Sequence, residues 1–449
     1  MKKYLFTALA AVTLMAAECN PQDAPKPTPV ITITNQPLAA TANFVTGAIS
    51  GSLTVTATVT QEQTLSYQWF CNTTNSATGG TELSGATTAT LVIPTTLAQA
   101  THYLYCQISA TGGATPVFSD VVKINVLSPG GGTATDPYKV YDETTLRKVG
   151  TGSGWTLGAH YQQICNITLT GTFTSIGASA TPFSGSYDGR GYSILDLNIP
   201  ATTETHQGLF KNLTGAVRNV ALINVNVSES TDGGENYVGA IAGANFGIIE
   251  NCYVTGSVTG QRIVGGIVAY NYAGTVKNCY TTCTVTSSGN YAGGIAGYNR
   301  NNSTNYATIA SCYATGNIKA SNYAGGIAGY NSSSCTIDGC VALNKEVMVD
   351  AGNTLAGRIT GSNTVLTNNF ARTSGMMLNG GITVTPDATG KHGADVSAAN
   401  INGANAATWW SGAEGPGFSA SVWSFDTGRL PHLKTTNGAP FDQAQTPAI

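Results

Sequence analysis

The sequence has few charged residues, few histidines and no long apolar stretch beyond its first residues. Charged side chains make up 10% of 449 residues, with 20 Lys and Arg against 23 Asp and Glu, so the formal net charge is −3. Binding to nucleic acid requires a basic surface, and binding to an anionic membrane requires a polybasic patch. The sequence provides neither. We therefore predict no nucleic-acid partner and a surface built mostly from Ser, Thr, Asn and Gly.

Motifs for catalysis and for metal binding are also missing. No Gly-x-Ser-x-Gly, His-Glu-x-x-His or phosphate-cradling loop occurs. The five histidines are scattered and no Cys-x-x-Cys pair is present, so we predict no metal and no cofactor. A glycosidase needs two carboxylates at a set separation. Asp232, Glu235 and Glu250 do not recur at a regular spacing, although acids on neighbouring repeats could still meet. We predict that the protein is not an enzyme.

The start of the chain has the composition of an export signal. Lys2 and Lys3 precede an apolar run, residues 4–17, that is too short for a membrane span. Cys19 before a Pro-rich tether, residues 20–29, predicts lipidation of Cys19 after removal of the signal 1–19. Glu18 departs from the usual lipoprotein pattern, so cleavage without lipid is the alternative. We predict an exported protein, lipid-anchored at the cell surface or outer membrane.

Glycine, in contrast, is abundant, with 54 residues, and much of it lies in a repeated phrase. The phrase Ala-Gly-Gly-Ile-Ala-Gly-Tyr-Asn occurs twice, and close variants of it occur three times more. The central isoleucines of the five copies are residues 241, 267, 295, 327 and 359, which are 26, 28, 32 and 32 residues apart. A period of this length predicts an array of stacked repeats.

The content of one repeat favours short strands over helices. Runs rich in Val, Ile, Thr and Tyr alternate with Gly and Asn, and no run has helical spacing. The apolar spacing between Ile249 and Cys252 breaks strand alternation, so the chain must turn at Asn251, and likewise at Ser311. Asn tolerates the positive φ of such corners. These features predict a parallel β-helix in which Cys252 and its equivalents (279, 312, 340) face inward as free thiols.

These phrases, with the lead-in Phe183–Tyr192 and the segments 208–210 and 218–220, resemble the GLUG motif of bacterial surface proteins. That family includes filamentous-haemagglutinin-like adhesins and the non-catalytic portion of some immunoglobulin A peptidases. The resemblance implies a solenoid over residues 138–390, including an N-terminal cap. It carries no catalytic residues.

Residues 30–127 have strand-like runs and resemble a bacterial immunoglobulin-like sandwich, followed by a flexible linker, residues 128–137. Cys71 lies two residues after Trp69 and therefore on the same strand face. In this fold the strand of Cys106 is a neighbour, so a Cys71–Cys106 disulfide is one prediction and two buried thiols are the alternative.

The last part of the chain is rich in large rings. Residues 391–434 contain three of the five tryptophans. They predict a cap that covers the final coil, with an aromatic binding patch as the alternative; residues 435–449 form a tail.

Three columns of tyrosines recur along the repeats, and they carry the functional prediction. If the cysteine column faces inward, the next residue faces outward, so Tyr253, Tyr280 and Tyr313 are expected to form a solvent-facing strip. The other columns are residues 270, 298 and 330, and residues 237, 291 and 323. The rings either stiffen the solenoid or bind a glycan or protein. We predict an adhesin-like protein that binds cell-surface or host glycans or glycoproteins. The alternatives are a polysaccharide-active enzyme and a structural envelope spacer.

Overall fold

A computed structural model describes residues 27–37, 41–201, 204–230, 234, 236–362, 364–379 and 382–434. The predicted signal and the lipidation site Cys19 lie outside these residues. The chain divides into two compact units, with the main boundary along the sequence between Val126 and Leu127. No helix in the described part is both long enough and apolar enough to cross a membrane.

The N-terminal unit consists of antiparallel strands, as predicted. The strands are β1 (Ile31–Asn35), β2 (Ala42–Val45), β3 (Ser52–Thr54), β4 (Thr56–Val59), β5 (Leu65–Asn72), β6 (Thr81–Glu82), β7 (Thr90–Val92), β8 (Thr101–Ala110), β9 (Val117–Phe118) and β10 (Val122–Leu127). The main sheet has the order β2-β10-β8-β5-β6, and β1-β4 and β3-β7 form separate pairs. Trp69 is fully buried in this unit.

The predicted Cys71–Cys106 disulfide is wrong. Both thiols are free. In the antiparallel pair β5–β8, Cys106 lies opposite Trp69, whereas Cys71 lies opposite Leu104. The two cysteines are therefore diagonal neighbours, whose Cα atoms are about 7–8 Å apart, beyond the usual range of a disulfide. Cys71 contacts His102 Nδ1 instead, at 3.6 Å.

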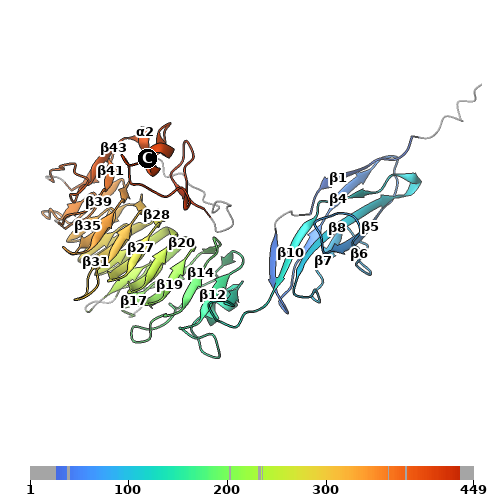
Figure 1. Ribbon diagram of the computed structural model, residues 1–449, viewed down its shortest axis with the longest axis horizontal. Helices are drawn as coiled ribbons and strands as arrows, with labels where there is room; N and C mark the ends of the chain where they lie inside the picture. Colours follow the sequence, from blue (N-terminus) through green and yellow to red (C-terminus); the bar gives the residue numbers. More distant parts are fainter. Residues whose placement is uncertain are drawn as a thin grey trace, which may run out of the picture. The chain divides into compact units, whose positions relative to one another are not determined.

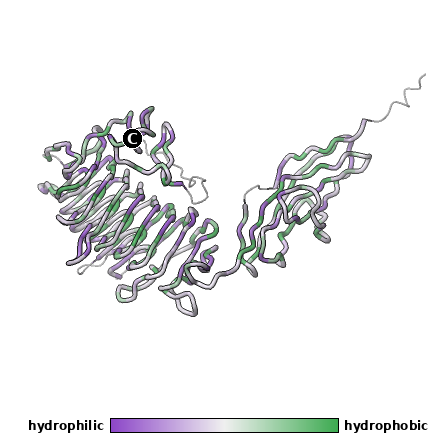
Figure 2. The backbone as a smooth tube through the Cα atoms, viewed as in Figure 1, coloured by the Kyte–Doolittle hydropathy of each residue, from purple (hydrophilic) through white to green (hydrophobic). Residues whose placement is uncertain are grey.

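The second unit is a parallel β-solenoid of about eight turns, from about residue 160 to 396. Figure 1 shows its strands stacked in chain order from β12 to β41. A complete coil contributes strands to four sheets, here called I to IV in their order along the repeat, whereas the first strands of the solenoid, from β11 to β16, belong to sheets III and IV only. Hydrophobic and hydrophilic segments alternate along each coil (Figure 2).

Sheets I and II carry the repeated Gly-rich phrase. Sheet I contains β17 (His206–Gln207), β21 (Tyr237–Gly239), β25 (Ile263–Gly265), β30 (Tyr291–Gly293), β35 (Tyr323–Gly325) and β40 (Ala356–Gly357). Sheet II contains β18 (Phe210–Leu213), β22 (Ala242–Asn245), β26 (Val268–Tyr272), β31 (Ala296–Arg300) and β36 (Ala328–Asn331).

Sheets III and IV complete each coil. Sheet III contains β11 (Tyr138–Val140), β12 (His160–Gln163), β14 (Ser186–Asp188), β19 (Ala216–Arg218), β23 (Ile248–Glu250), β27 (Thr275–Lys277), β32 (Thr308–Ala310) and β37 (Thr336–Asp338). Sheet IV contains β13 (Ile167–Thr168), β15 (Ser193–Leu195), β16 (Asn198–Ile199), β20 (Ala221–Ser228), β24 (Tyr253–Gly260), β28 (Tyr280–Thr281), β29 (Thr284–Ser287), β33 (Tyr313–Ala314), β34 (Ile318–Lys319), β38 (Val341–Ala342), β39 (Glu346–Met348), β41 (Phe370–Arg372), β42 (Met377–Leu378) and β43 (Ala394–Val396).

The corner between sheets III and IV confirms the turn that was predicted from sequence. Asn251 has φ 55° and Ser311 has φ 51°. The left-handed conformation reverses the side-chain direction, so Ile249 and Cys252 both face the core. Cys252, Cys279, Cys312 and Cys340 are fully buried and free, as predicted. Each thiol donates a hydrogen bond to the carbonyl two residues earlier, at 3.1–3.4 Å.

The N-terminal end of the solenoid is closed by α1 (Glu143–Lys148), whose Leu146 is buried in the solenoid core. Asp142 and Thr145 form a capping box at the start of this helix.

The C-terminal segment covers more of the solenoid than the sequence predicted. Strand β43 adds to β41 as part of the last coil. The chain then forms α2 (Ala398–Ile401), α3 (Ala406–Ser411) and the pair β44 (Trp423–Ser424) and β45 (His432–Leu433). Their rings pack against the outer face of sheet IV, in one cluster with the tyrosines of β24, β28 and β33. The segment therefore covers the side of several coils, including the last one, where Trp409 packs on Phe370.

Candidate ligand-contact surface

The tyrosine column that was expected to face solvent is buried. The exposed fractions of Tyr253, Tyr280 and Tyr313 are 2%, 0% and 0%. Their rings stack in parallel, with centroids 4.9 and 4.7 Å apart, and the ring of Trp423 lies within 6.2 Å of two of them. The hydroxyl of Tyr313 donates to Pro431 O at 2.7 Å. The expectation of solvent exposure was wrong because the outer face of sheet IV is covered by a segment from much later in the chain.

The other two tyrosine columns, together with Tyr272, form a continuous aromatic surface, which we call the tyrosine ridge. It lies on sheets I and II and consists of Tyr237, Tyr270, Tyr272, Tyr291, Tyr298, Tyr323 and Tyr330. Tyr237 and Tyr270 are buried, and the other five are partly exposed. Neighbouring ring centroids are 4.8–5.7 Å apart, in both stacked and edge-to-face arrangements. Such contacts hold the rings in fixed positions.

The repeated glycines bring the strands of the ridge close together. A Cβ atom on Gly293 would lie 2.0 Å from Ala296 O, and a Cβ on Gly325 would lie 1.9 Å from Ala328 O. The φ angle of neither residue is in the left-handed region. These glycines are therefore required because sheets I and II approach so closely that no side chain fits between their backbones.

A buried ladder of amides fixes the position of the ridge tyrosines on sheet II. Asn245 donates to Asn271, Asn271 to Asn299, and Asn299 to Asn331, at 2.8, 2.8 and 2.7 Å. All four side chains are fully buried. Each of the last three asparagines directly follows a ridge tyrosine, so the ladder sets the register at which the rings emerge.

A groove of about 560 Å³ borders the ridge at its C-terminal end. Tyr298, Tyr323, Tyr330 and Arg300 line one part of it, and Ser332, Ser333, Ser362 and Thr364 are among the polar residues that line the rest. Burial raises the pKa of Tyr330, and burial likewise raises the pKa of Tyr291. The phenols of Tyr330 and Tyr291, which like any phenol carry a proton at neutral pH, keep that proton to a higher pH and can donate hydrogen bonds to a ligand.

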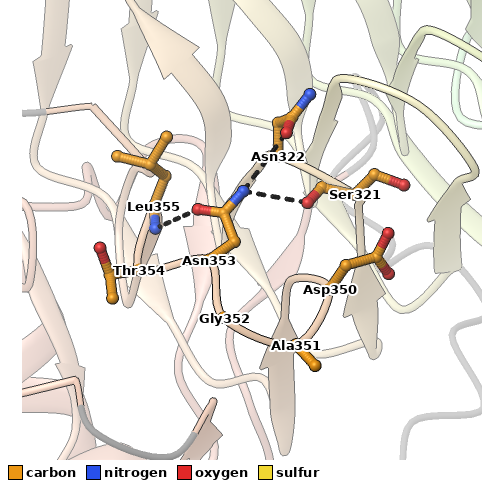
Figure 3. Close-up of a pocket in the computed structure, with 8 residues that line it drawn as sticks. All are labelled: Ser321, Asn322, Asp350, Ala351, Gly352, Asn353, Thr354 and Leu355. Carbon is orange, nitrogen blue, oxygen red and sulfur yellow. Dashed lines mark hydrogen bonds between the residues drawn. The ribbon is translucent and has the colours of Figure 1, made fainter.

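A second, more open hollow of about 610 Å³ shares Leu355 with the groove as a lining residue. In Figure 3 the amide of Asn353 lies between Asn322 and the backbone of Ser321, to which it donates at 3.3 and 3.0 Å. Asp350 is the single charged residue of its lining. The two hollows together form a polar surface beside the aromatic one.

The outer face of sheet III carries a column of alternating charge. Asp188, Arg218, Glu250 and Lys277 occupy equivalent positions on successive coils. Glu250 pairs with Arg218 at 3.3 Å and with Lys277 at 3.2 Å. Charged residues that do not recur in the repeat therefore do come together on neighbouring coils, but the paired residues carry opposite charges. The column is therefore an ion-pair network, and its members do not form the pair of carboxylates that a glycosidase needs.

A small hollow of about 180 Å³ on the same sheet contains a Ser–His contact. His160 Nδ1 lies 2.8 Å from Ser186 Oγ. Asp188 also lines this hollow, but its Oδ1 accepts hydrogen bonds from Arg190 N and Asn219 Nδ2. A triad needs a third group that orients the histidine. Among the described residues no carboxylate forms a hydrogen bond with the His160 ring. The described residues also contain no cluster of three metal-binding side chains. The absence of enzymatic activity stays a prediction.

Comparison with known proteins identifies the repeat. The family model of the GLUG motif matches residues 234–259 and 288–319, which include β21, most of β24, β30 and β34. The solenoid contains GLUG motifs.

Relatives of this GLUG solenoid include much longer proteins. The chain is 31% identical over 149 residues to halomucin of Haloquadratum walsbyi, in a match that covers 30% of this chain and 2% of halomucin. It is 32% identical over 139 residues to a protein of Evansella cellulosilytica that is provisionally named a Gly-rich membrane protein, covering 29% of this chain and 16% of that protein. The matches thus span less than a fifth of either relative.

One solved structure is similar over most of the chain. A Bacteroides ovatus protein that is provisionally named an immunoglobulin A1 protease has a TM-score of 0.55 and 25% sequence identity. The match covers 71% of this chain and 95% of that one. The similarity supports the β-solenoid architecture that the repeats predict.

The tyrosines of the ridge were visible in the sequence as repeated columns, but the groove was not. Arg300 begins an insert that occurs in one coil only, Ser362 lies within the least regular copy of the repeat, and Thr364 follows that copy. The insert and the irregular copy depart from the period, so the periodicity did not indicate that they border one groove. They meet because successive coils place residues about 30 apart in sequence side by side.

Proposed function

We propose that this protein is an exported, cell-surface binding protein whose GLUG solenoid presents the tyrosine ridge and its groove to a glycan or protein. The observation that carries the proposal is the partly exposed ridge of stacked rings beside a polar groove. Rigid aromatic rings offer a large contact area and lose little conformational entropy on binding. The adhesin-like role and the lipid anchor at Cys19 are parts of this proposal.

The surroundings of the ridge favour binding over mere stiffening of the solenoid. A purely structural column of tyrosines can be fully covered, as Tyr253, Tyr280 and Tyr313 are. Tyr298, Tyr323 and Tyr330 instead remain partly exposed and line a groove. A relative that is provisionally named a membrane protein is compatible with a location at the cell surface.

The test compares the full chain with a variant that carries Tyr323→Ser and Tyr330→Ser, on a glycan array and in pull-downs from cell surfaces. We expect the wild type to bind and the variant to lose at least tenfold in affinity, since each ring removed takes away contact area at the centre of the surface. Tyr103→Ser, in the N-terminal unit, is the matched control. A wild type that binds nothing would favour the structural-spacer alternative.

A further inference from the structure

The groove beside the ridge has a guanidinium group as its one charged lining residue. Arg300 is exposed, and its Nη1 donates to the hydroxyl of Tyr270 at 3.2 Å. Its Cζ lies 5.9 Å from the centre of the Tyr298 ring. Among the described residues Arg300 forms no ion pair, unlike Arg218 and Arg147, each of which contacts a glutamate. The ridge thus holds the guanidinium in place with no charge to neutralise it.

The rest of the groove supplies neutral polar groups. Asn301, Ser332, Ser333 and Thr364 bring amide and hydroxyl groups to its lining, and neither Asp nor Glu is part of it. Leu355 is its one large aliphatic residue. The lining therefore combines ring faces, hydroxyl and amide hydrogen-bonding groups and a single cation.

We propose that this groove binds an acidic saccharide, a sugar that carries a carboxylate group. The planar guanidinium of Arg300 pairs with the carboxylate through two parallel hydrogen bonds. The rings of Tyr323 and Tyr330 pack against the apolar face of the sugar, and the serines and Asn301 bond to its hydroxyls. This inference rests on the proposed function and names the ligand class for the same surface.

The lining favours a sugar over an acidic peptide. Peptide recognition by an extended strand needs an open sheet edge, and recognition of an apolar side chain needs a hydrophobic pocket. The groove lies on the outer faces of sheets whose strands are paired along the solenoid, and its single aliphatic residue makes no pocket. A saccharide, with its many hydroxyls and its small apolar faces, matches the available groups.

The experiment titrates the full chain with a short oligogalacturonate and with the same oligosaccharide after methyl esterification of its carboxylates. We expect the acidic form to bind roughly ten- to hundredfold more tightly than the ester, as for one charge-assisted bidentate pair. Arg300→Gln should remove this difference, and Arg300→Lys should keep part of it. Lys319→Gln removes the same charge from an exposed position outside the groove and should have no effect.

The outcomes separate this inference from the proposed function. One outcome is that the acidic oligosaccharide and its ester bind equally well and that the Tyr323→Ser, Tyr330→Ser variant binds neither. That outcome would overturn the preference for an acidic sugar and leave the proposed binding function intact. Capture on cells with no binding of either sugar, or binding of an acidic peptide at the groove instead, would also overturn the inference. Failure of both sugars and of cell capture would overturn the inference and the proposed function together.

Discussion

At the residue scale, the glycines of the repeated phrase act by having no side chain. Gly265, Gly293 and Gly325 lie where a Cβ would meet a carbonyl oxygen at 1.9–2.0 Å. Positive φ is supplied elsewhere, by Asn251, Ser311 and their equivalents. The two kinds of position therefore tolerate different substitutions.

Gly293→Ala should destabilise the solenoid by about 3 kcal/mol or more, because the new methyl group forces the backbones of sheets I and II apart. Chemical denaturation followed by circular dichroism measures the change. Gly158→Ala is the control, since its Cβ would meet nothing nearer than Ser184 Oγ at 3.5 Å. Equal effects of the two substitutions would contradict the explanation from close approach.

A second residue-scale consequence concerns pH. Burial, together with the charges of Lys391 and Arg358, lowers the pKa of His392 to about 4. The unfolded chain takes up a proton near pH 6.5, whereas the folded one does so only near pH 4. The free energy of unfolding should therefore fall as pH decreases from about 6.5 to about 4, by at most about 3 kcal/mol.

His392→Gln should reduce that pH dependence without abolishing it, because burial also lowers the pKa of His432. Urea titrations at several pH values give the slope for both proteins. A variant with the same slope as the wild type would show that His392 is not the group responsible.

At the element scale, the irregular sequence of the last copy of the repeat has a structural reason. Arg358 stands where the copies at Gly266, Gly294 and Gly326 have a glycine. Its side chain is buried, pairs with Asp395 at 2.6 Å, and donates to the carbonyls of His392 and Gly393. The departure from the phrase thus ties the last coil to the segment that follows it.

The segment 398–434 is the other element that sets the surface of the solenoid. Trp410 and Trp423 are fully buried, and Trp423 lies 5.8 Å from the Tyr313 ring and 4.8 Å from the Phe418 ring. The segment holds the tyrosines of sheet IV away from water. The tyrosines that a ligand can reach in the solenoid repeats are therefore those of the other columns.

Trp423→Ala should release this segment at a cost of about 3–5 kcal/mol, the range for removing a large buried ring. We expect limited proteolysis to cut within residues 398–434 before any coil is cut, and a hydrophobic dye to bind the uncovered tyrosines. Val422→Ala, at a half-buried neighbour, should do much less. Simultaneous loss of the coils and the segment would instead show that they unfold as one unit.

At the scale of the whole molecule, all nine cysteines in the described part of the chain are free. Burial is the main cause that raises the pKa of Cys252, Cys279 and Cys312 well above the usual value of a thiol. Thiolate is the reactive form. The cysteine column of the solenoid should therefore be inert while the fold is intact.

Maleimide labelling of the native protein, read by peptide mass spectrometry, should modify Cys71 and Cys165 first, since these two are not fully buried. The solenoid column should react only in denaturant. Recovery of a disulfide between Cys252 and Cys279, or between Cys71 and Cys106, would contradict the free thiols of the structure.

Much of the architecture followed from local pattern. The period of 26–32 residues, the Val- and Thr-rich runs and the spacing of Ile249 and Cys252 were enough to predict a parallel solenoid, its left-handed corner at Asn251 and its buried thiols. These features depend on side-chain alternation and on the stacking of like residues in successive coils, which one repeat already encodes.

Which tyrosines meet solvent was decided only by the tertiary structure. Alternation correctly places Tyr253, Tyr280 and Tyr313 on the outer face, but the segment 398–434 returns from far along the chain and covers them. The groove at Arg300 likewise combines an insert in one coil with the irregular end of another. Neither arrangement follows from the repeat, because each depends on contacts made by segments that do not have the repeat pattern.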